Sequence, residues 1–272
     1  MPRHISLVFP GQGSQSVGML DDFSQEDFLS IKSAIADLPF DLLDIIKNGP
    51  EDIINKTSVT QPALLATSYL HYKRFLSLTN IVPNIIAGHS LGEYSALVVS
   101  DSIELKKAIS LVHKRGLFME SSEKGSMFAI LYLDLSFVID ICNEVSIATG
   151  LVVSPANINS PNQIVIAGNE EAAVIAADRC KEAGAKRCIK LKVGAASHCM
   201  LMKAASESLL AELSSIHFNE PSIPIIHNYD ASIESSSINL VDKLTSQLTY
   251  PVKWIDTMNS VSYTISEPTR PY

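Results

Sequence analysis

Cysteine is scarce in this sequence, and none of its four copies is placed to bind a metal. The thiols form no CxxC pair, and no histidine stands at zinc-ligand spacing from them. A chain of 272 residues with so few cysteines is also unlike the small folds that disulfides hold together. We therefore expect buried, reduced thiols and no bound metal or cofactor. The cysteines are Cys142, Cys180, Cys188 and Cys199.

Long apolar runs and an excess of basic residues are absent too. No run approaches the ~20 apolar residues of a membrane-spanning helix, and residues 1–9 contain an apolar run that is too short for a signal peptide. The net charge of -8 disfavours nucleic-acid binding, because such binding relies on lysine and arginine to neutralise phosphates. These absences predict a cytoplasmic protein without a membrane or nucleic-acid partner.

The glycine motifs of nucleotide-binding proteins are missing as well. Residues 9–15 read FPGQGSQ after a predicted first strand, but they match neither the Walker loop nor the GxGxxG fingerprint, because position 16 is serine. The glycines still let the backbone approach a ligand closely, and the amides there are suited to an oxyanion or a phosphate. A plain turn is the alternative.

The sequence does contain enough apolar residues for a large core, since 46% of its residues are hydrophobic and 18% are charged. Apolar runs of strand length alternate with longer segments of helical period, which predicts an α/β fold with a largely parallel sheet. Strands are expected at 5–9 and 84–87, and helices at 62–78, directly after residue 90, at 105–119 and at 201–213.

The middle of the chain has shorter elements. Their order suits a small α+β subdomain at 126–194, inserted into a large subdomain that comprises residues 1–125 and 195–272. Residues 214–236 are rich in serine, proline and isoleucine and predict loops with one strand. In the small subdomain, strands are expected at 127–133, 151–153, 163–167 and 188–193, and a helix at 170–183.

The strongest chemical signal is the sequence GHSLG at 88–92, a GxSxG motif between a predicted strand and a predicted helix. This context is that of a nucleophile elbow, in which glycines permit a tight turn with the serine hydroxyl at its tip. Negative charge is favoured there, because the helix N-terminus lies beneath it. We interpret Ser90 as a nucleophile, and a glycine-rich turn with an incidental serine is the alternative.

A serine nucleophile needs a base within hydrogen-bond reach. His89 is adjacent in sequence, but neighbouring side chains at such a turn point apart. His198 stands in a short polar break between a strand-like run and a helix start, where catalytic residues are common. From the residues alone His198 has only a modest edge over His113, His217 and His227, since a single histidine is more often structural than catalytic.

Six ordered stretches together resemble the malonyl-CoA:acyl carrier protein transacylases of fatty acid synthesis, from about residue 5 to about residue 254. That family implies a large α/β-hydrolase-like domain with a mostly parallel sheet and an inserted, ferredoxin-like α+β subdomain. The stretches are GQGSQ at 11–15, QPALL at 61–65, GHSLGEYSAL at 88–97, KRGLFM at 114–119, ANINSPNQIVIAG at 156–168 and SHCMLM at 197–202.

The resemblance implies a ping-pong acyltransferase. Ser90 would take malonyl from coenzyme A and pass it to the phosphopantetheine thiol of an acyl carrier protein. The phosphopantetheine is attached to the carrier protein and is not a cofactor of this chain. His198 would be the general base, oriented by the backbone carbonyl of Gln247 rather than by an aspartate. The backbone amides of Gln12 and Leu91 would form the oxyanion hole, as expected for the residue after the nucleophile. We expect a monomer.

Arg115 would bind the malonyl carboxylate, because a guanidinium matches a carboxylate with two parallel hydrogen bonds. A solvated charge near a helix C-terminus is the alternative for this residue. The positions expected to contact substrate besides Arg115 are Gln61, Met119, Asn159 and His89. An exposed basic patch beside the insertion would face the acidic carrier protein, with a solvated strand as the alternative, and its residues would be Lys186, Arg187, Lys190 and Lys192.

The sequence departs from the family pattern at two places, and each departure predicts a structural difference. The stretch VGAAS at 193–197 replaces a loop that usually contains proline, so we expect a looser position for His198. The sequence ends at 267–272, where the family continues through a Gly-Pro-Gly turn and a closing helix. We therefore expect exposed apolar surface, marginal stability and self-association, because lost burial destabilises by ~25 cal/mol per Å².

Two other functions remain open. A serine hydrolase would pass the acyl group to water and would need an acidic residue beside the histidine, but the candidates Asp134, Asp140 and Asp178 all lie in the predicted insertion. An inactive carrier-protein binder is the non-enzymatic alternative. An assay with malonyl-CoA, with and without carrier protein, separates transfer from hydrolysis, and labelling of Ser90 by malonyl-CoA tests for the inactive binder.

Overall fold

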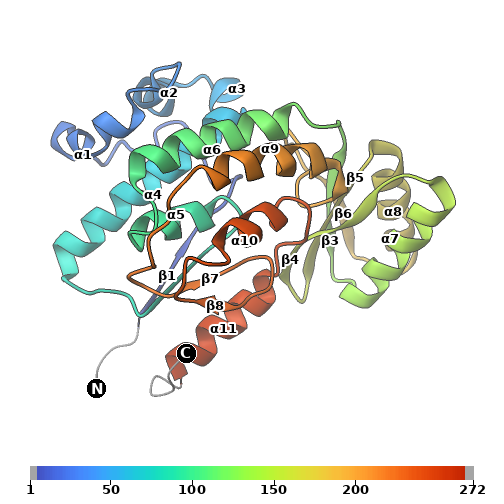
Figure 1. Ribbon diagram of the computed structural model, residues 1–272. Coiled ribbons are helices and arrows are strands. Elements are labelled where there is room, and N and C mark those ends of the chain that lie inside the picture. The colour runs from blue at the N-terminus through green and yellow to red at the C-terminus, as the bar shows by residue number, and fades with distance from the viewer. Residues whose placement is uncertain (1–4, 267–272) are drawn as a thin grey trace.

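Two four-stranded sheets organise the structure, a computed structural model that describes residues 5–266 (Figure 1). The first sheet has the order β1-β2-β7-β8. β1 pairs with β2 and β2 with β7 in parallel, whereas β7 and β8 are antiparallel, so the sheet is mixed. Its strands are β1 (Ser6–Phe9), β2 (Ile85–Gly88), β7 (Ile225–Ile226) and β8 (Ile233–Glu234).

Helices cover both faces of this sheet. All of β2 is buried, as is typical of a central parallel strand. Ile86 faces the main core, while Ile85 and Ala87 face α11 (Trp254–Ser266), whose Val261 packs against them. The helices of the main core beside this sheet are α4 (Thr57–Thr79), α5 (Gly92–Val99), α6 (Leu105–Glu120), α9 (Lys203–Ser214) and α10 (Leu240–Ser246).

The second sheet has the order β4-β5-β3-β6 and is antiparallel throughout. Its chain order is strand, helix, strand, strand, helix, strand, and both helices pack against it at the right of Figure 1. The elements are β3 (Ser126–Leu131), α7 (Leu135–Thr149), β4 (Val153–Ser160), β5 (Gln163–Gly168), α8 (Glu170–Glu182) and β6 (Arg187–Lys190).

Two backbone hydrogen bonds join the second sheet to the segment that leads into α11. Val252 donates its amide to the carbonyl of Ala156 (2.9 Å) and accepts from the amide of Ile158 (2.9 Å), so this segment is tied to β4. The GxSxG motif at the carboxyl end of β2 also contacts β4, because Nε2 of His89 lies 2.9 Å from the side-chain oxygen of Asn159.

Three short helices lie between β1 and α4 and pack against the main core. The first begins with a capping box, in which the Ser24 hydroxyl accepts from the amide of Asp27 and the Asp27 carboxylate accepts from the amide of Ser24. Ile31 and Ile46 are fully buried against the core. The helices are α1 (Gln25–Ile35), α2 (Leu42–Asn48) and α3 (Glu51–Ile54).

The predicted strands and helices are confirmed in kind, with shifted ends. The strand expected at 151–153 runs instead from 153 to 160, and residues 214–236 hold two short strands rather than one. Three of the four cysteines are buried, as expected, and Cys188 is partly buried. Within residues 5–266 no helix is long and apolar enough to cross a membrane.

Most of the C-terminal segment from residue 254 onward is helical in the described structure. Residues 254–266 form α11, which covers one face of the first sheet at β2 and β7. Val8 of β1, which pairs with Ala87 on the same face, is 49% exposed. Residues 267–272 lie outside the described residues. The expected marginal stability and self-association stay predictions.

Candidate active site

The GxSxG motif forms a sharp turn between β2 and α5. Ser90 has φ +52°, a left-handed conformation that is uncommon for a residue with a side chain. The two flanking glycines are required by close packing: a Cβ on Gly88 would lie 1.9 Å from the backbone of Gly92, and one on Gly92 would lie 2.3 Å from the carbonyl of Phe9. The turn therefore packs directly on β1, and it holds the serine in the strained conformation of a nucleophile elbow.

His198 is the histidine that reaches this serine. Its Nε2 lies 2.9 Å from the Ser90 hydroxyl, and its Nδ1 lies 2.6 Å from the carbonyl oxygen of Gln247. With Nδ1 donating to that carbonyl, Nε2 is free to accept the serine proton. The side chain is buried, and both ring nitrogens have a hydrogen-bond partner. The looser position expected from the missing proline stays a prediction. No acidic residue is needed for this orientation.

The electrostatic environment of His198 favours the neutral imidazole. Burial, and next the positive charge of Arg115, lower the pKa of His198 to about 3. The histidine is therefore unprotonated at neutral pH and ready to accept a proton.

We expect the acid limb of the kcat/KM profile for acylation to lie well below pH 6.5, the ordinary value for histidine. Because the pKa of His198 is lowered, the base stays unprotonated as the pH falls through 6.5, and the rate declines only near the lowered pKa. Rapid-quench acylation assays from mildly acidic to neutral pH should therefore show no fall in rate as the pH passes through 6.5. A half-maximal rate at pH 6.5 or above would contradict the lowered pKa.

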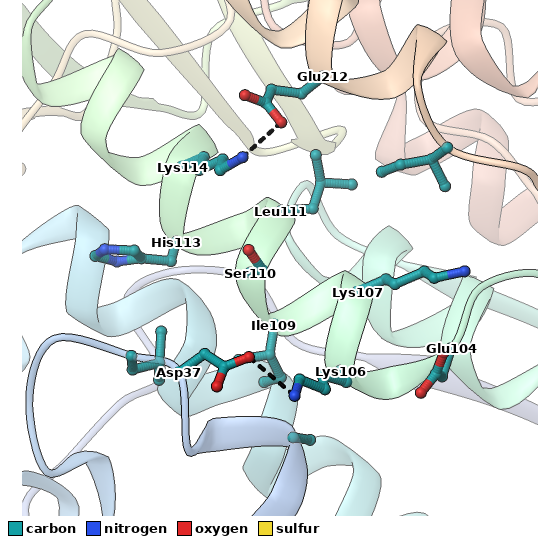
Figure 2. A pocket seen from close by; sticks show the side chains of 13 residues that line it. Asp37, Glu104, Lys106, Lys107, Ile109, Ser110, Leu111, His113, Lys114 and Glu212 are labelled. Carbon is teal, nitrogen blue, oxygen red and sulfur yellow. Dashed lines mark hydrogen bonds and ion pairs between the residues drawn. The ribbon is translucent and has the colours of Figure 1, made fainter.

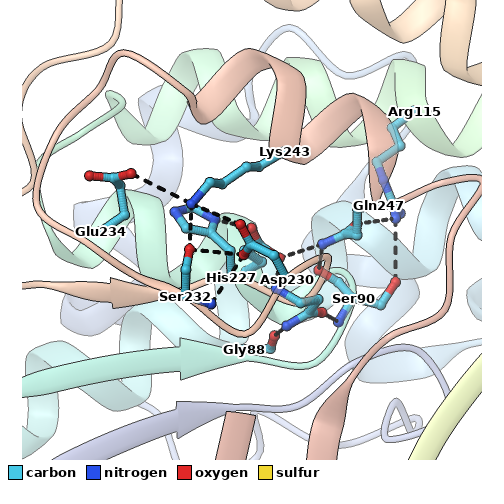
Figure 3. A network of polar contacts seen from close by, with 11 residues as sticks. Gly88, Ser90, Arg115, His227, Asp230, Ser232, Glu234, Lys243 and Gln247 are labelled. Carbon is cyan, nitrogen blue, oxygen red and sulfur yellow. Dashed lines mark hydrogen bonds and ion pairs between the residues drawn. The ribbon is translucent and has the colours of Figure 1, made fainter. Parts of the chain in front are cut away.

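Arg115 comes from α6 and points at the same serine (Figure 3). Its Nη2 donates to the Ser90 hydroxyl (3.3 Å) and to Oε1 of Gln247 (2.9 Å), and its Nη1 donates to Oε1 of Gln61 (2.9 Å). The side chain is only 1% exposed, so the alternative of a solvated charge is wrong. Among the ion pairs of residues 5–266, none includes Arg115. A buried guanidinium held by neutral amides is suited to receive an anionic ligand.

A cavity of about 550 Å³ opens in front of Ser90. Its wall includes residues expected at the site from sequence, namely Gln12, His89, Leu91 and Met119, together with His198 and Arg115. The cavity is large enough for a small acyl group with part of its thiol carrier.

Two of the expected substrate contacts lie elsewhere. Gln61 is fully buried behind Arg115 and also donates to the sulfur of Met119. Asn159 contacts Nε2 of His89 at 2.9 Å, whereas Asn157, two residues earlier on β4, lies on the cavity wall. Both therefore support residues of the wall and do not form it.

The predicted basic patch is divided. Lys186 and Arg187 are exposed, and Nζ of Lys186 lies 4.1 Å from the ring centre of Tyr132. Lys190 forms an ion pair with Glu170 and lies on the opposite face of β6 from Arg187, because side chains alternate along a strand. Lys192 lines the mouth of the active-site cavity.

The other histidines and the candidate acids are not at the site. His113 contacts the carbonyl of Ser58, and His217 is exposed. His227 is buried beneath the serine turn against Glu93. Asp134, Asp140 and Asp178 cap or lie on the helices of the second sheet, so they do not orient His198.

Sequence reasoning missed the polar groups under the turn (Figure 3). Glu93 is 1% exposed and accepts from the amide of Asn228 and from Nε2 of Gln247. The sequence signal for this site was a single carboxylate in the otherwise weakly polar segment that forms α5. Apart from Glu93, only one tyrosine and one serine of this helix are polar, and all of its residues are buried. A charge in such a helix is rare unless it is paired.

A second cavity, of about 420 Å³, lies against α1, α6 and α9 (Figure 2). Two lysines on its wall are already paired, Lys106 with Asp37 (2.9 Å) and Lys114 with Glu212 (2.7 Å). It holds no pairing of nucleophile and base like that of Ser90 and His198. Within residues 5–266, no cluster of three or more His, Cys, Asp or Glu side chains is arranged to hold a metal ion.

Comparisons with known proteins identify the family of this chain. The family model described as acyl transferase domain matches residues 6–264. The chain is 43% identical over 258 residues to the malonyl CoA-acyl carrier protein transacylase of Escherichia coli (strain K12), covering 92% of this chain and 82% of that protein. The Bacillus subtilis (strain 168) protein of the same name is 35% identical over 263 residues, covering 94% and 82%.

Solved structures give the same result. An acyl carrier protein S-malonyltransferase from Vibrio cholerae matches with a TM-score of 0.90 at 42% identity, covering 95% of this chain and 86% of that one. A malonyl-transacylase in complex with a type II PKS acyl-carrier protein matches with a TM-score of 0.91 at 41% identity, covering 97% and 86%. The chain therefore belongs to the acyl transferase family, and within it to the malonyl-CoA:acyl carrier protein transacylases.

Proposed function

We propose that this protein transfers malonyl from malonyl-CoA to the phosphopantetheine thiol of an acyl carrier protein, through a malonyl ester on Ser90, in support of fatty acid synthesis. The observation that carries the proposal is the buried guanidinium of Arg115 at 3.3 Å from the hydroxyl of a serine that His198 also contacts. A serine and a histidine alone serve many acyl transfers. The buried cation selects an acyl group that carries a carboxylate.

In the first half-reaction His198 removes the hydroxyl proton through Nε2 as Ser90 attacks the thioester carbonyl. The backbone amides of Gln12 and Leu91 stabilise the oxyanion that forms. The carbon–sulfur bond then breaks, the thiolate takes the proton from His198, and coenzyme A leaves. In the second half-reaction the carrier thiol gives its proton to His198 and attacks the malonyl ester, and Ser90 regains its proton as it leaves.

The roles of the remaining parts follow from this scheme. Gln247 orients His198 through its backbone carbonyl. Met119 and His89 form part of the wall around the acyl group, and Gln61 and Asn159 support the side chains of that wall. Every step uses groups of this chain and of its substrates, so we propose that the enzyme needs no metal or cofactor. We also propose a cytoplasmic monomer.

The architecture supports a division into two subdomains. We assign residues 1–125 and 195–272 to an α/β-hydrolase-like subdomain and residues 126–194 to a ferredoxin-like one. The strands of the second sheet all fall between residues 126 and 190, and their antiparallel order is that of the ferredoxin-like pattern. The serine comes from the first subdomain, and the cavity also uses Met127 and Asn157 of the second.

A partition assay tests the proposed function against its alternatives. Malonyl-CoA is incubated with the protein, with and without acyl carrier protein, and malonyl-carrier and free malonate are measured separately. We expect malonyl-carrier to dominate and malonate to form slowly. Equal malonate release with and without the carrier would indicate a hydrolase, and no turnover of malonyl-CoA would leave only a carrier-protein binder.

The basic patch gives a prediction about the carrier. Because both proteins are acidic, docking needs a local positive surface, and Lys186 and Arg187 are exposed at the start of β6. Reversing both charges is expected to slow transfer to carrier protein, with a loss that shrinks as salt rises. Transfer to free pantetheine should not change.

The matched control is Lys73→Glu, a reversal at an exposed lysine on α4. It should leave transfer to both acceptors at the level of the unmodified protein. An equal loss for carrier protein and pantetheine in the double variant would remove the docking role.

A further inference from the structure

We propose that Glu93 is a positioning residue that sets Ser90, His198 and Arg115 relative to one another, acting through Gln247 and Asn228. The inference rests on the proposed malonyl transfer. Glu93 was not among the site residues expected from the sequence, and its carboxylate contacts neither the substrate nor the reacting atoms. Figure 3 shows the polar groups that converge beneath the turn.

The contacts of Glu93 define its two connections. Its Oε2 accepts from Nε2 of Gln247 (2.7 Å) and from the amide of Asn228 (3.1 Å). Its Oε1 lies 2.5 Å from Nδ1 of His227, which is fully buried. Glu93 stands three residues after the nucleophile on α5, so the carboxylate lies under the turn that carries Ser90.

The first connection determines how the side chain of Gln247 is oriented. The carboxylate oxygen that accepts from the amide of Asn228 also accepts from the NH₂ end of the Gln247 amide. The oxygen end therefore faces Arg115 and accepts from Nη2 at 2.9 Å. The same residue accepts from His198 through its backbone carbonyl, so one residue contacts both the base and the cation.

Besides Glu93, the Nε2 of Gln247 donates to the backbone carbonyl of Ser90 (3.1 Å). Loss of the acceptor at Glu93 would leave this carbonyl as the remaining partner of the NH₂ group among the described residues. An amide held by one acceptor instead of two rotates more readily and can present its NH₂ group to the guanidinium, and two donors then face each other. Arg115 would lose one of its two amide partners and its fixed direction. Binding of a malonyl carboxylate should suffer more than binding of an uncharged acyl group.

The second connection holds the turn. The side chain of Asn228 accepts from the amide of Ser90 (2.6 Å) and donates to the carbonyl of Gly88 (2.7 Å), so it brackets the strained residue. The backbone amide of Asn228 is the group that Glu93 accepts from. Strained conformations at functional sites persist only where the surroundings fix them. Glu93 is therefore connected to Ser90 through Asn228, and to His198 and Arg115 through Gln247.

A purely structural role is the alternative, in which Glu93 only satisfies buried donors. That role predicts lower stability and an equal loss of activity toward every acyl group. The positioning role predicts a loss that depends on the acyl carboxylate, because Arg115 is one of the groups that Glu93 positions.

Single-turnover acylation of Ser90 by malonyl-CoA and acetyl-CoA, followed by intact mass, separates the two roles. Glu93→Met removes the acceptor, and we expect the malonyl-over-acetyl rate ratio to fall roughly 10-fold or more, the scale of one hydrogen bond to a charged group. Glu93→Gln keeps an acceptor for Gln247 and Asn228, and its NH₂ can donate to Nδ1 of His227 when the ring proton of that histidine moves to Nε2. This conservative variant should keep most of the ratio.

Two further variants complete the test. Gln247→Met removes the side-chain amide but keeps the carbonyl that orients His198, so it should lower the ratio without Glu93 being altered. The double variant Glu93→Met with Gln247→Met should lower the ratio no further than Gln247→Met alone, because residues that act through one another are not additive. Glu234→Met changes another carboxylate of the same polar region, one that pairs with Lys243, and should leave the ratio unchanged.

The outcomes are distinct. An unchanged ratio in Glu93→Met, or a fall in Glu93→Gln as large as in Glu93→Met, overturns the proposal. If Glu93→Met does not fold, an unchanged ratio in Gln247→Met overturns it. Failure of the unmodified protein to take malonyl from malonyl-CoA would instead refute the proposed function.

Discussion

Replacing Ser90 by alanine is expected to abolish the acyl-enzyme and to lower malonyl transfer by a factor of order 10⁶. The hydroxyl is the group that forms the ester, and it is the one that His198 contacts at 2.9 Å and Arg115 at 3.3 Å. His198→Ala should cost a comparable factor, because an unassisted serine is a weak nucleophile at neutral pH. Transfer rates with malonyl-CoA and carrier protein measure both losses.

The double variant tests whether the two residues act as a unit. Combining Ser90→Ala with His198→Ala should cost little more than either change alone. His217→Ala is the matched control, since that histidine is exposed and does not line the cavity in front of Ser90. An acyl adduct that persists on the Ser90→Ala protein would refute the nucleophile.

The second large effect is expected at Arg115. Arg115→Ala removes the cation that would bind the malonyl carboxylate, and a hydrogen bond to a charged group contributes roughly 1.5–3 kcal/mol, so malonyl transfer should fall roughly 10- to 150-fold. Acetyl transfer should change little or rise, because acetyl has no carboxylate and the site loses a buried charge. Paired rates with malonyl-CoA and acetyl-CoA measure this selectivity.

The adjacent lysine provides the control for Arg115. Lys114 lies on the same helix but is half exposed and pairs with Glu212, so Lys114→Ala should cost only what a surface ion pair contributes, about 0–1 kcal/mol of stability. Its malonyl-over-acetyl ratio should match the unmodified protein. Equal losses for both acyl groups in Arg115→Ala would mean that this arginine serves the fold.

Local sequence signals were sufficient for the elements that hold the nucleophile. The apolar run at 84–87, the glycines at 88 and 92 and the helical period after them predict a strand, a turn and a helix, and the structure has β2, the Ser90 turn and α5. Here a short stretch of sequence is enough to predict the kind and order of the elements. The glycines are needed because the turn packs on β1.

Contacts between distant segments were harder to predict. Gln61 and Asn159 were expected on the cavity wall, but Gln61 supports Arg115 from 54 positions away and Asn159 binds His89 from 70 positions away. Side-chain direction at such positions depends on how α4 and β4 pack against α6 and the turn. One sequence does not contain that information in any local pattern.

The partners of Glu93 were also impossible to predict from local sequence. Its partners His227, Asn228 and Gln247 lie 134 to 154 positions away, at the end of β7 and after α10. A carboxylate among buried residues signals that a partner exists, but it does not identify the partner. The two-residue strands β7 and β8 were equally hard to locate, since they are too short to have a period.

Mass measurement of the intact protein after brief exposure to malonyl-CoA tests the central claim most directly. We predict one added malonyl group, located by fragmentation on the peptide that contains Ser90, and its disappearance on addition of acyl carrier protein as the same group appears on the carrier. No adduct, an adduct on another residue, or loss of the group to water at the same rate with and without the carrier would contradict the account.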